Sequence, residues 1–167
     1  QPQKVYLDIA TWKTLPQRQL SSGLAETIKH ACLADREFFD YLSEHIKDVL
    51  AVKDEVCRHI AEKNCEIKYQ VVMKDEWESG LREVLNLGHT VGRATETVSD
   101  YKLLHGEAVA IGLVAEVKMA EHFGYCTAED EAAMVAMLKQ ADLPTEIPDY
   151  IDRDALVKKL YTDKKVR

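Results

Sequence analysis

The chain has 167 residues, a net charge of −7 and a pI of about 5.4, and 46% of its residues are hydrophobic. This length and composition predict one globular domain, or one domain with a fragment of another, around a substantial core. The negative charge argues against a nucleic-acid or anionic-membrane surface, and no apolar run reaches the ~18 residues of a membrane span. The four cysteines show no CxxC pairing, which indicates reduced thiols and a cytoplasmic protein.

The first residues predict a β-strand. Residues 4–9 read KVYLDI, which alternates in character and favours β-structure. No second strand of comparable strength follows, and a lone strand is not stable. Because the chain also begins at Gln1 without a methionine, we expect its true start to be missing. We therefore assign residues 1–16 to the last strand and linker of an absent preceding domain, and residues 17–167 to a helical domain.

The rest of the chain has helical periodicity. Ser22 is expected to cap a helix over about 23–34, and further helices are expected over about 36–50, 53–73 and 81–98. A helix over 105–123, ended by Gly124, is apolar nearly all round and should be the buried central helix. Thr127 with Asp130 and then Asp152 are expected to cap the last two helices. The predicted class is all-α, with one N-terminal strand.

The expected helix over 81–98 carries an unusual set of side chains. Four polar residues are spaced by four, three and four positions, namely Arg82, Asn86, His89 and Arg93. At about 100° per residue they would share a stripe roughly 60° wide. Gly88 and Gly92 lie beside this stripe, and glycine costs roughly 1 kcal/mol relative to alanine inside a helix. We therefore expect another backbone or a ligand to approach this helix closely.

Two histidines and one glutamate form a candidate metal site. His89 lies in an NLGHT motif, His105 follows sixteen residues later in LHGE, and Glu26 lies in AETIK. Two imidazoles and a carboxylate are typical ligands of catalytic zinc with an open position for water or substrate. His105 opens a predicted helix, whose dipole favours the neutral, metal-binding imidazole. Lys29 lies one turn from Glu26, so that a carboxylate and an ammonium can enter one pocket.

Several lysines add positive charge near this candidate site. Lys68 on the long third helix and the pair Lys164 and Lys165 could join Lys29 there. A metal beside several cations suits a small anionic substrate that carries phosphate and carboxylate groups. Each feature also has a simpler interpretation, because an acid–lysine pair one turn apart is most often a surface pair and a terminal lysine pair is most often solvated. Spacing alone does not prove that the histidines converge.

Together these motifs resemble the C-terminal helical domain of the 3-dehydroquinate synthase family. The resemblance rests on LP at 15–16, GLAETIK at 23–29, LNLGHT at 85–90 and LHGEAVAIG at 104–112. It runs in register over essentially the whole chain, down to LP at 143–144 and DKK at 163–165. That family belongs to the sugar-phosphate cyclases. The resemblance implies an N-terminal, Rossmann-like NAD-binding domain that this chain lacks, except for its last strand.

The resemblance also implies roles for individual residues. It places the Zn²⁺ (or Co²⁺) ligands on Glu26, His89 and His105. It places the substrate-binding and catalytic groups on Lys29, Lys68, Arg82 and Asn86 and on Lys164 or Lys165, with one further substrate-site position occupied here by Arg93. It places the contacts to NAD, at the junction of the two domains, on Thr11, Trp12, Lys13 and Thr14. The expected partners are a small sugar-phosphate substrate, the missing NAD-binding domain and, as a homodimer, a second copy of the chain.

The implied reaction closes 3-deoxy-D-arabino-heptulosonate 7-phosphate into 3-dehydroquinate, in the shikimate route to aromatic amino acids. Phosphate leaves, and NAD is used and regenerated within one turnover. One position departs from the family, whose pattern Gly-His-Thr-x-Gly-His would place a histidine at Arg93. Arginine cannot act as a base at neutral pH, although it can bind phosphate. We leave the general base open and expect Arg93 to bind substrate, the alternative being a surface arginine paired with a nearby acid such as Glu96.

Other functions remain in competition. Because Lys68, Arg82 and Asn86 are all present, we favour a dehydroquinate synthase over sister cyclases that make inosose or valiolone products. A metal-dependent polyol dehydrogenase is a further enzyme alternative. A non-catalytic helical binding module with structural histidines is an alternative of a different class, and metal content after dialysis would separate it from the enzymes. On its own, the chain is expected to be inactive.

Overall fold

The protein is described here by a computed structural model, which covers residues 3–162. Seven α-helices and two short 3-10 helices form in that range: η1 Ile9–Thr14, α1 Gln17–Ala34, α2 Arg36–Leu50, α3 Asp54–Lys74, η2 Leu81–Asn86, α4 His89–Val98, α5 His105–His122, α6 Ala128–Gln140 and α7 Arg153–Leu160. The described residues contain no strand, so the all-α class is confirmed. None of these helices is long and apolar enough to cross a membrane.

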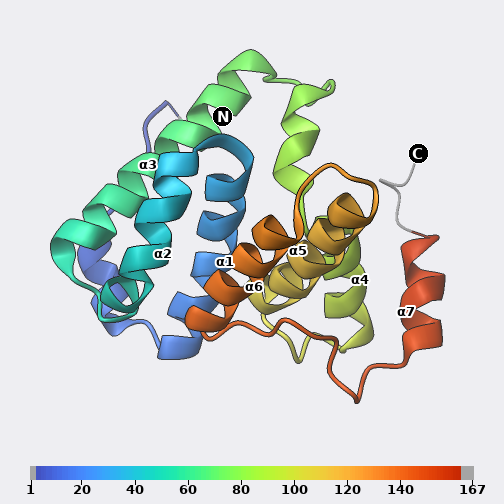
Figure 1. The fold of residues 1–167 in the computed structure, drawn as a ribbon. Coiled ribbons are helices and arrows are strands. Elements are labelled where there is room, and N and C mark those ends of the chain that lie inside the picture. Colours follow the sequence, from blue (N-terminus) through green and yellow to red (C-terminus); the bar gives the residue numbers. More distant parts are fainter. Residues whose placement is uncertain (1–2, 163–167) are drawn as a thin grey trace.

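Helix α5 lies at the centre of the molecule, between two hydrophobic clusters (Figure 1). The larger cluster joins α5 to α1, α2, α3 and α6, and its fully buried members include Ile28, Leu42, Ile60, Leu113 and Leu138. The smaller cluster joins α5 to α4 and α7 through Ala94, Ala108, Ile111 and Leu156. The apolar run over residues 108–114 is buried on every side, as the sequence predicts for a central helix.

The N-terminal segment does not form the predicted strand over residues 4–9. Residues 4–8 have no regular structure, and Ile9 opens η1 after the Asp8 side chain accepts a hydrogen bond from the Ala10 backbone N at 2.9 Å. A strand needs the backbone hydrogen bonds of a neighbouring strand, and the described part of the chain supplies none. The side chains of Val5, Tyr6 and Leu7 are exposed. Their place in the sheet of a preceding domain stays a prediction.

Helix α1 begins more than a turn earlier than the sequence predicts. It starts at Gln17, after Pro16 in the N-cap position, so the expectation that Ser22 caps a helix at 23–34 was wrong. The Ser22 hydroxyl oxygen instead accepts a hydrogen bond from the backbone N of Gly106 at 3.1 Å. The longer helix matters for the site, because it places Arg18 and Ser22 on the side of α1 that carries Glu26.

The helix predicted over 81–98 is broken in two. Between η2 and α4 the chain turns at Gly88, whose φ of 77° lies in the left-handed region that glycine adopts without strain. A Cβ atom on Gly88 would lie 2.9 Å from the Leu113 side chain, and one on Gly112 would overlap the Gly88 carbonyl oxygen. A Cβ on Gly92 would lie 3.0 Å from the Ala108 carbonyl oxygen. The start of α4 therefore packs backbone to backbone on α5, as the two glycines led us to expect.

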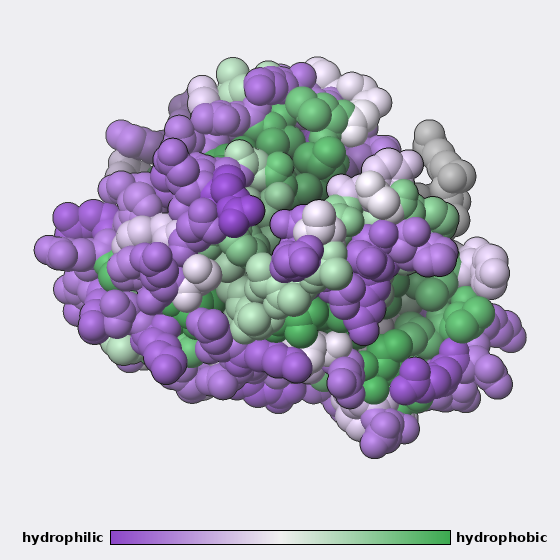
Figure 2. All heavy atoms as spheres, in the orientation of Figure 1, coloured by the Kyte–Doolittle hydropathy of each residue, from purple (hydrophilic) through white to green (hydrophobic). Residues whose placement is uncertain are grey.

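The molecular surface is mostly hydrophilic on the face shown in Figure 2. Hydrophobic side chains gather on this face over η2, where Leu81 and Val84 are exposed. The neighbouring loop adds Trp77, which is also exposed.

Candidate metal centre

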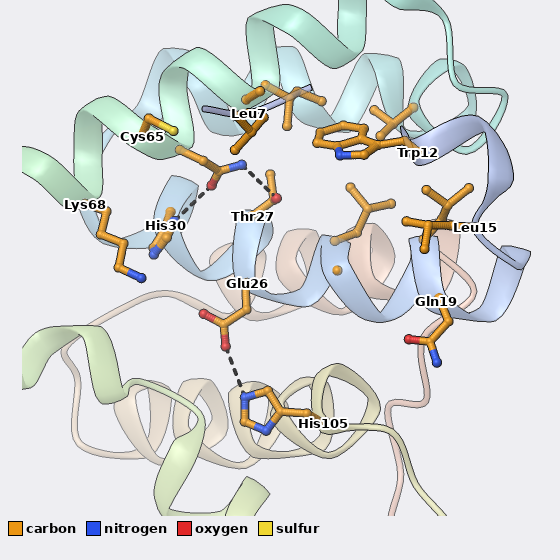
Figure 3. A pocket seen from close by; sticks show the side chains of 17 residues that line it. Leu7, Trp12, Leu15, Gln19, Glu26, Thr27, His30, Cys65, Lys68 and His105 are labelled. Atoms are coloured by element: carbon orange, nitrogen blue, oxygen red, sulfur yellow. Dashed lines mark hydrogen bonds and ion pairs between the residues drawn. The ribbon is translucent and has the colours of Figure 1, made fainter. Parts of the chain in front are cut away.

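Three helices bring Glu26, His89 and His105 together. Glu26 lies in the middle of α1, whereas His89 and His105 are the first residues of α4 and α5. The Glu26 Oε1 atom lies 3.4 Å from the Nε2 atoms of both histidines, and the three potential ligand atoms all lie within 4.8 Å of one another. Figure 3 shows the Glu26 side chain pointing from α1 across to His105. Their role as metal ligands stays a prediction, although one ion could reach all three.

Each imidazole has a partner for its other nitrogen. His89 Nδ1 lies 3.1 Å from the Leu87 carbonyl oxygen, and His105 Nδ1 lies 3.2 Å from a carboxylate oxygen of Glu96. Both partners are acceptors, so each ring can donate from Nδ1, and Nε2, which faces Glu26, is the atom placed to bind an ion. Histidines that bind metals usually have such an outer partner, which fixes the orientation of the ring.

A buried lysine accompanies the candidate ligands. Lys29 is only 3% exposed, and its Nζ atom donates a hydrogen bond to Glu26 Oε2 at 2.5 Å. Burial acts to raise the pKa of Glu26, but the hydrogen bond and charge of Lys29 outweigh it and hold that pKa below its usual value. Burial, together with the Lys29 charge, lowers the pKa of His89. At neutral pH an ionised carboxylate therefore faces a neutral imidazole, and these are the forms that bind metals.

The start of α5 is fixed to α1 by a series of polar contacts. Three α1 side chains spaced four residues apart meet three successive residues of α5, as the pairs Arg18–Glu107 at 2.6 Å, Ser22–Gly106 at 3.1 Å and Glu26–His105 at 3.4 Å. A Cβ atom on Gly106 would overlap the Ser22 carbonyl oxygen, so the two backbones are in close contact here. Sequence analysis missed Arg18 and Ser22, although their spacing from Glu26 was a signal.

The predicted polar stripe of residues 82–93 was wrong, because η2 and α4 are separate helices. Arg82, the second residue of η2, bonds to the loop before that helix. Its backbone N donates to Asp75 at 2.9 Å, and its guanidinium donates to the Glu76 carbonyl oxygen at 3.2 Å. Asn86, at the end of η2, is half-buried.

Arg93 lies on α4, one turn after His89, and is half-buried. The alternative in which it pairs with Glu96 was wrong, because the Glu96 carboxylate contacts His105. Within residues 3–162, no acid forms an ion pair with Arg93.

A cavity of about 500 Å³ adjoins the candidate metal centre. Its wall includes Glu26 and His105 on one side and Leu7 and Trp12 from the N-terminal segment on the other (Figure 3). Lys68, which is exposed, lines the same cavity from α3. The cavity thus joins two of the three candidate ligands, one predicted cation and one residue of the predicted cofactor segment.

The other predicted residues lie elsewhere. Thr11 Oγ1 donates to the Asp8 carbonyl oxygen at 2.7 Å, and Thr14 Oγ1 donates to the Thr11 carbonyl oxygen at 3.0 Å, so both hydroxyls bond to backbone of η1 or of its N-cap residue. Lys13 forms an ion pair with Asp54 of α3 at 2.8 Å. Lys164 and Lys165 lie outside the described residues.

The fold and this centre define a helical domain with a candidate two-histidine, one-carboxylate metal site. A family model described as the C-terminal part of 3-dehydroquinate synthase matches residues 23–166, and the chain belongs to this family. The 3-dehydroquinate synthase of Acetivibrio thermocellus is 41% identical over 167 residues, which are 100% of this chain and 46% of that protein. The enzyme of Geobacter metallireducens is 44% identical, with 100% and 46% covered. The chain thus spans about half the length of these curated relatives.

Solved structures share the fold. The 2-epi-5-epi-valiolone synthase ValA of Streptomyces hygroscopicus subsp. jinggangensis 5008, with NAD⁺ and Zn²⁺ bound, matches with a TM-score of 0.84 and 26% identity over 92% of this chain and 43% of that one. A 2-deoxy-scyllo-inosose synthase complexed with carbaglucose-6-phosphate, NAD⁺ and Co²⁺ matches with a TM-score of 0.83 and 21% identity over 92% and 42%. The second likeness concerns the fold alone.

Proposed function

We propose that this chain is the metal- and substrate-binding half of a 3-dehydroquinate synthase, which closes 3-deoxy-D-arabino-heptulosonate 7-phosphate into 3-dehydroquinate with loss of phosphate. The observation that carries the proposal is the convergence of Glu26, His89 and His105 beside buried Lys29. Relatives that are 41% and 44% identical bear that name, whereas the valiolone synthase is 26% identical. This difference favours a dehydroquinate synthase over a sister cyclase.

The donor set fits a resident divalent cation. One carboxylate oxygen and two imidazole nitrogens can reach one ion, and such a set suits Zn²⁺ and also Co²⁺. The solved structure of the valiolone synthase, which shares the fold, has Zn²⁺ bound. When bound, the ion would act as a Lewis acid that polarises and acidifies a substrate hydroxyl. The Lys29 ammonium keeps Glu26 ionised and fixes one of its oxygens, so that the other remains directed at the two histidines.

Cations around the centre would bind the anionic substrate. Lys29 is buried beside Glu26, so water screens its charge less than that of a surface lysine. Lys68 is exposed at the cavity wall, and Arg93 lies one turn after His89. We assign these side chains to the phosphate and carboxylate groups of the substrate, to which they would donate charge-assisted hydrogen bonds. Four further residues keep the same predicted role without direct support from the cavity, namely Arg82, Asn86, Lys164 and Lys165.

The position of Trp12 supports a cofactor contact. Trp12 lines the cavity that also contains Glu26 and His105, so a group bound there could touch both the N-terminal segment and the metal centre. NAD would be held mostly by the other half of the protein and would be used and regenerated in each turnover. Contacts from Thr11, Lys13 and Thr14 stay predictions.

The free thiols of all four cysteines support a reducing, cytoplasmic location. The homodimer stays a prediction.

Product analysis tests this function directly. An enzyme that joins this chain to its nucleotide-binding half should release phosphate from 3-deoxy-D-arabino-heptulosonate 7-phosphate and form 3-dehydroquinate with catalytic NAD. The sugar phosphates used by sister cyclases should be poor substrates. Preferred turnover of one of those sugar phosphates, or net NAD reduction by a polyol without phosphate release, would assign the chain to one of the enzyme alternatives instead.

A further inference from the structure

One acidic residue lies in the apolar neighbourhood of the central helix. Glu116 on α5 is half-buried next to Val117, within a run whose other members from 108 to 117 are hydrophobic residues and one glycine. Burial raises the pKa of its carboxyl group, and hydrogen bonds from the backbones of Gly88 and Thr90 oppose that rise. The Gly88 backbone N donates to Glu116 Oε2 at 2.8 Å.

These backbone groups belong to the start of α4. The first N–H groups of a helix have no partner within it, and they are usually satisfied by the side chain of the N-cap residue. The N-cap of α4 is Gly88, which has no side chain. Its left-handed φ would strain a residue that has a side chain, and a Cβ atom there would lie too close to Leu113. The carboxylate of Glu116 therefore reaches across from α5 and takes the place of the missing cap.

The two donors flank a candidate metal ligand. Gly88 precedes His89, so the hydrogen bond from its backbone N to Glu116 holds the peptide plane before the histidine, and the Thr90 backbone on the other side also interacts with this carboxylate. A negative charge at a helix N-terminus is also favoured by the helix dipole. Glu116 itself is absent from the group of potential ligands.

We propose that Glu116 is a positioning residue for the metal centre, which holds the first turn of α4 so that His89 faces Glu26 and His105 before the metal binds. It acts through the backbone of residues 88–90 and not by contact with the ion. The inference rests on the proposed metal site. Sequence analysis missed this residue, although a lone acid in an apolar run was a signal.

Zinc titration of purified protein against a chelator of known affinity tests this role. Glu116→Ala should weaken Zn²⁺ binding about tenfold, the lower end of the range for outer partners of metal ligands. Glu116→Gln, which keeps the side-chain length and one acceptor oxygen, should weaken Zn²⁺ binding by a smaller factor. The matched control is Glu121→Ala, because Glu121 is an exposed glutamate on the same helix and its loss should leave the affinity unchanged.

Thermal unfolding of the metal-free proteins separates positioning from general stability. Both Glu116 variants should remain folded at the temperature of the titration, so that a changed dissociation constant reports on the site itself. If Glu116→Ala fails to fold, Glu116→Gln decides by the same titration. A dissociation constant within twofold of the wild type in the folded Glu116 variants would overturn the proposal. A wild-type protein that binds no zinc would instead overturn the metal site, and this inference with it.

Discussion

Arg18 and Glu107, which are 89 positions apart in the sequence, form a two-point ion pair between α1 and α5. Arg18 Nε donates to Glu107 Oε1 at 2.6 Å, and Arg18 Nη2 donates to Oε2 at 2.7 Å. The same guanidinium donates to the Lys102 carbonyl oxygen at 3.0 Å. The Glu107 carboxylate also accepts a hydrogen bond from the backbone N of Leu104 at 2.8 Å. The pair thus joins the helix that carries Glu26 to the first turn of the helix that begins with His105.

Loss of this pair should lower stability. Arg18→Ala would leave the carboxylate of Glu107, a side chain that is only 11% exposed, without its cation. We expect the free energy of unfolding to fall by about 1–2 kcal/mol, towards the lower part of the range for charged hydrogen bonds because the Arg18 side chain is 57% exposed. Urea unfolding at pH 7 measures this change.

The control is Arg36→Ala, which removes an exposed pair with Asp40 one turn away. Such a surface pair contributes about 0.3–0.5 kcal/mol. If both substitutions lower the free energy of unfolding by the same amount, the contact between Arg18 and Glu107 has no special role in holding α1 and α5 together.

Stability should also fall in mild acid because of His30. This side chain is buried, and burial lowers its pKa, while its Nδ1 atom contacts Asn64 Oδ1 at 2.9 Å. The unfolded chain, with a histidine pKa of about 6.5, therefore binds a proton that the folded protein does not. The free energy of unfolding should be fully retained above about pH 6.5 and should decrease below it, by at most about 1.4 kcal/mol per pH unit for each such histidine.

Urea unfolding at several pH values, on the wild type and on His30→Gln, would check this. His30→Gln should reduce the slope below pH 6.5, and His122→Gln, at an exposed histidine on α5, should not. An unchanged slope in His30→Gln would show that the protonation of His30 does not oppose folding.

Arg93 should act in substrate binding and not as a base. In the intact enzyme, Arg93→Ala should weaken substrate binding about ten- to hundredfold, because a charge-assisted hydrogen bond of roughly 1.5–3 kcal/mol is lost. Arg93→His should be tolerated, since histidine is the residue usual in the family. Steady-state kinetics of both variants measure this, with Arg153→Ala, at an exposed arginine on α7, as the control. Unchanged kcat and KM in Arg93→Ala would remove the residue from the site.

The isolated chain should bind NAD weakly and should not turn over substrate. Of the predicted cofactor residues 11–14, Trp12 lines the cavity beside the metal centre, and the phosphate-binding half is expected in the rest of the protein. Isothermal titration of residues 1–167 with NAD measures this directly. Micromolar affinity would contradict the assignment of the nucleotide site to the other half.

Local signals in the sequence predicted much of the fold. The caps at Thr127 and Asp152 form as expected, since each depends only on residues within one turn. The central place of α5 followed from a long apolar run, which has no other stable location. The candidate ligands Glu26, His89 and His105 were found from residue type, although their distances could come only from the structure.

The rest depends on packing between distant segments. The start of α1 was misplaced because Pro16 makes no side-chain cap bond, whereas Ser22 is of a type that often caps helices. The break at Gly88 was missed because helical periodicity continues across it, and only the contact with Gly112 of α5 requires the turn. The partners of Arg18 and Glu116 were missed for the same reason, since each lies on another helix.

The most direct test of the metal centre is the zinc content of the purified protein after equilibrium dialysis. We predict one zinc ion per chain, lost in His89→Ala because the set would keep only Glu26 and His105. His122→Ala, at an exposed histidine of α5, should retain the full amount. A wild-type protein without stoichiometric zinc, or a His89→Ala variant that binds zinc as tightly as the wild type, would contradict the proposed centre.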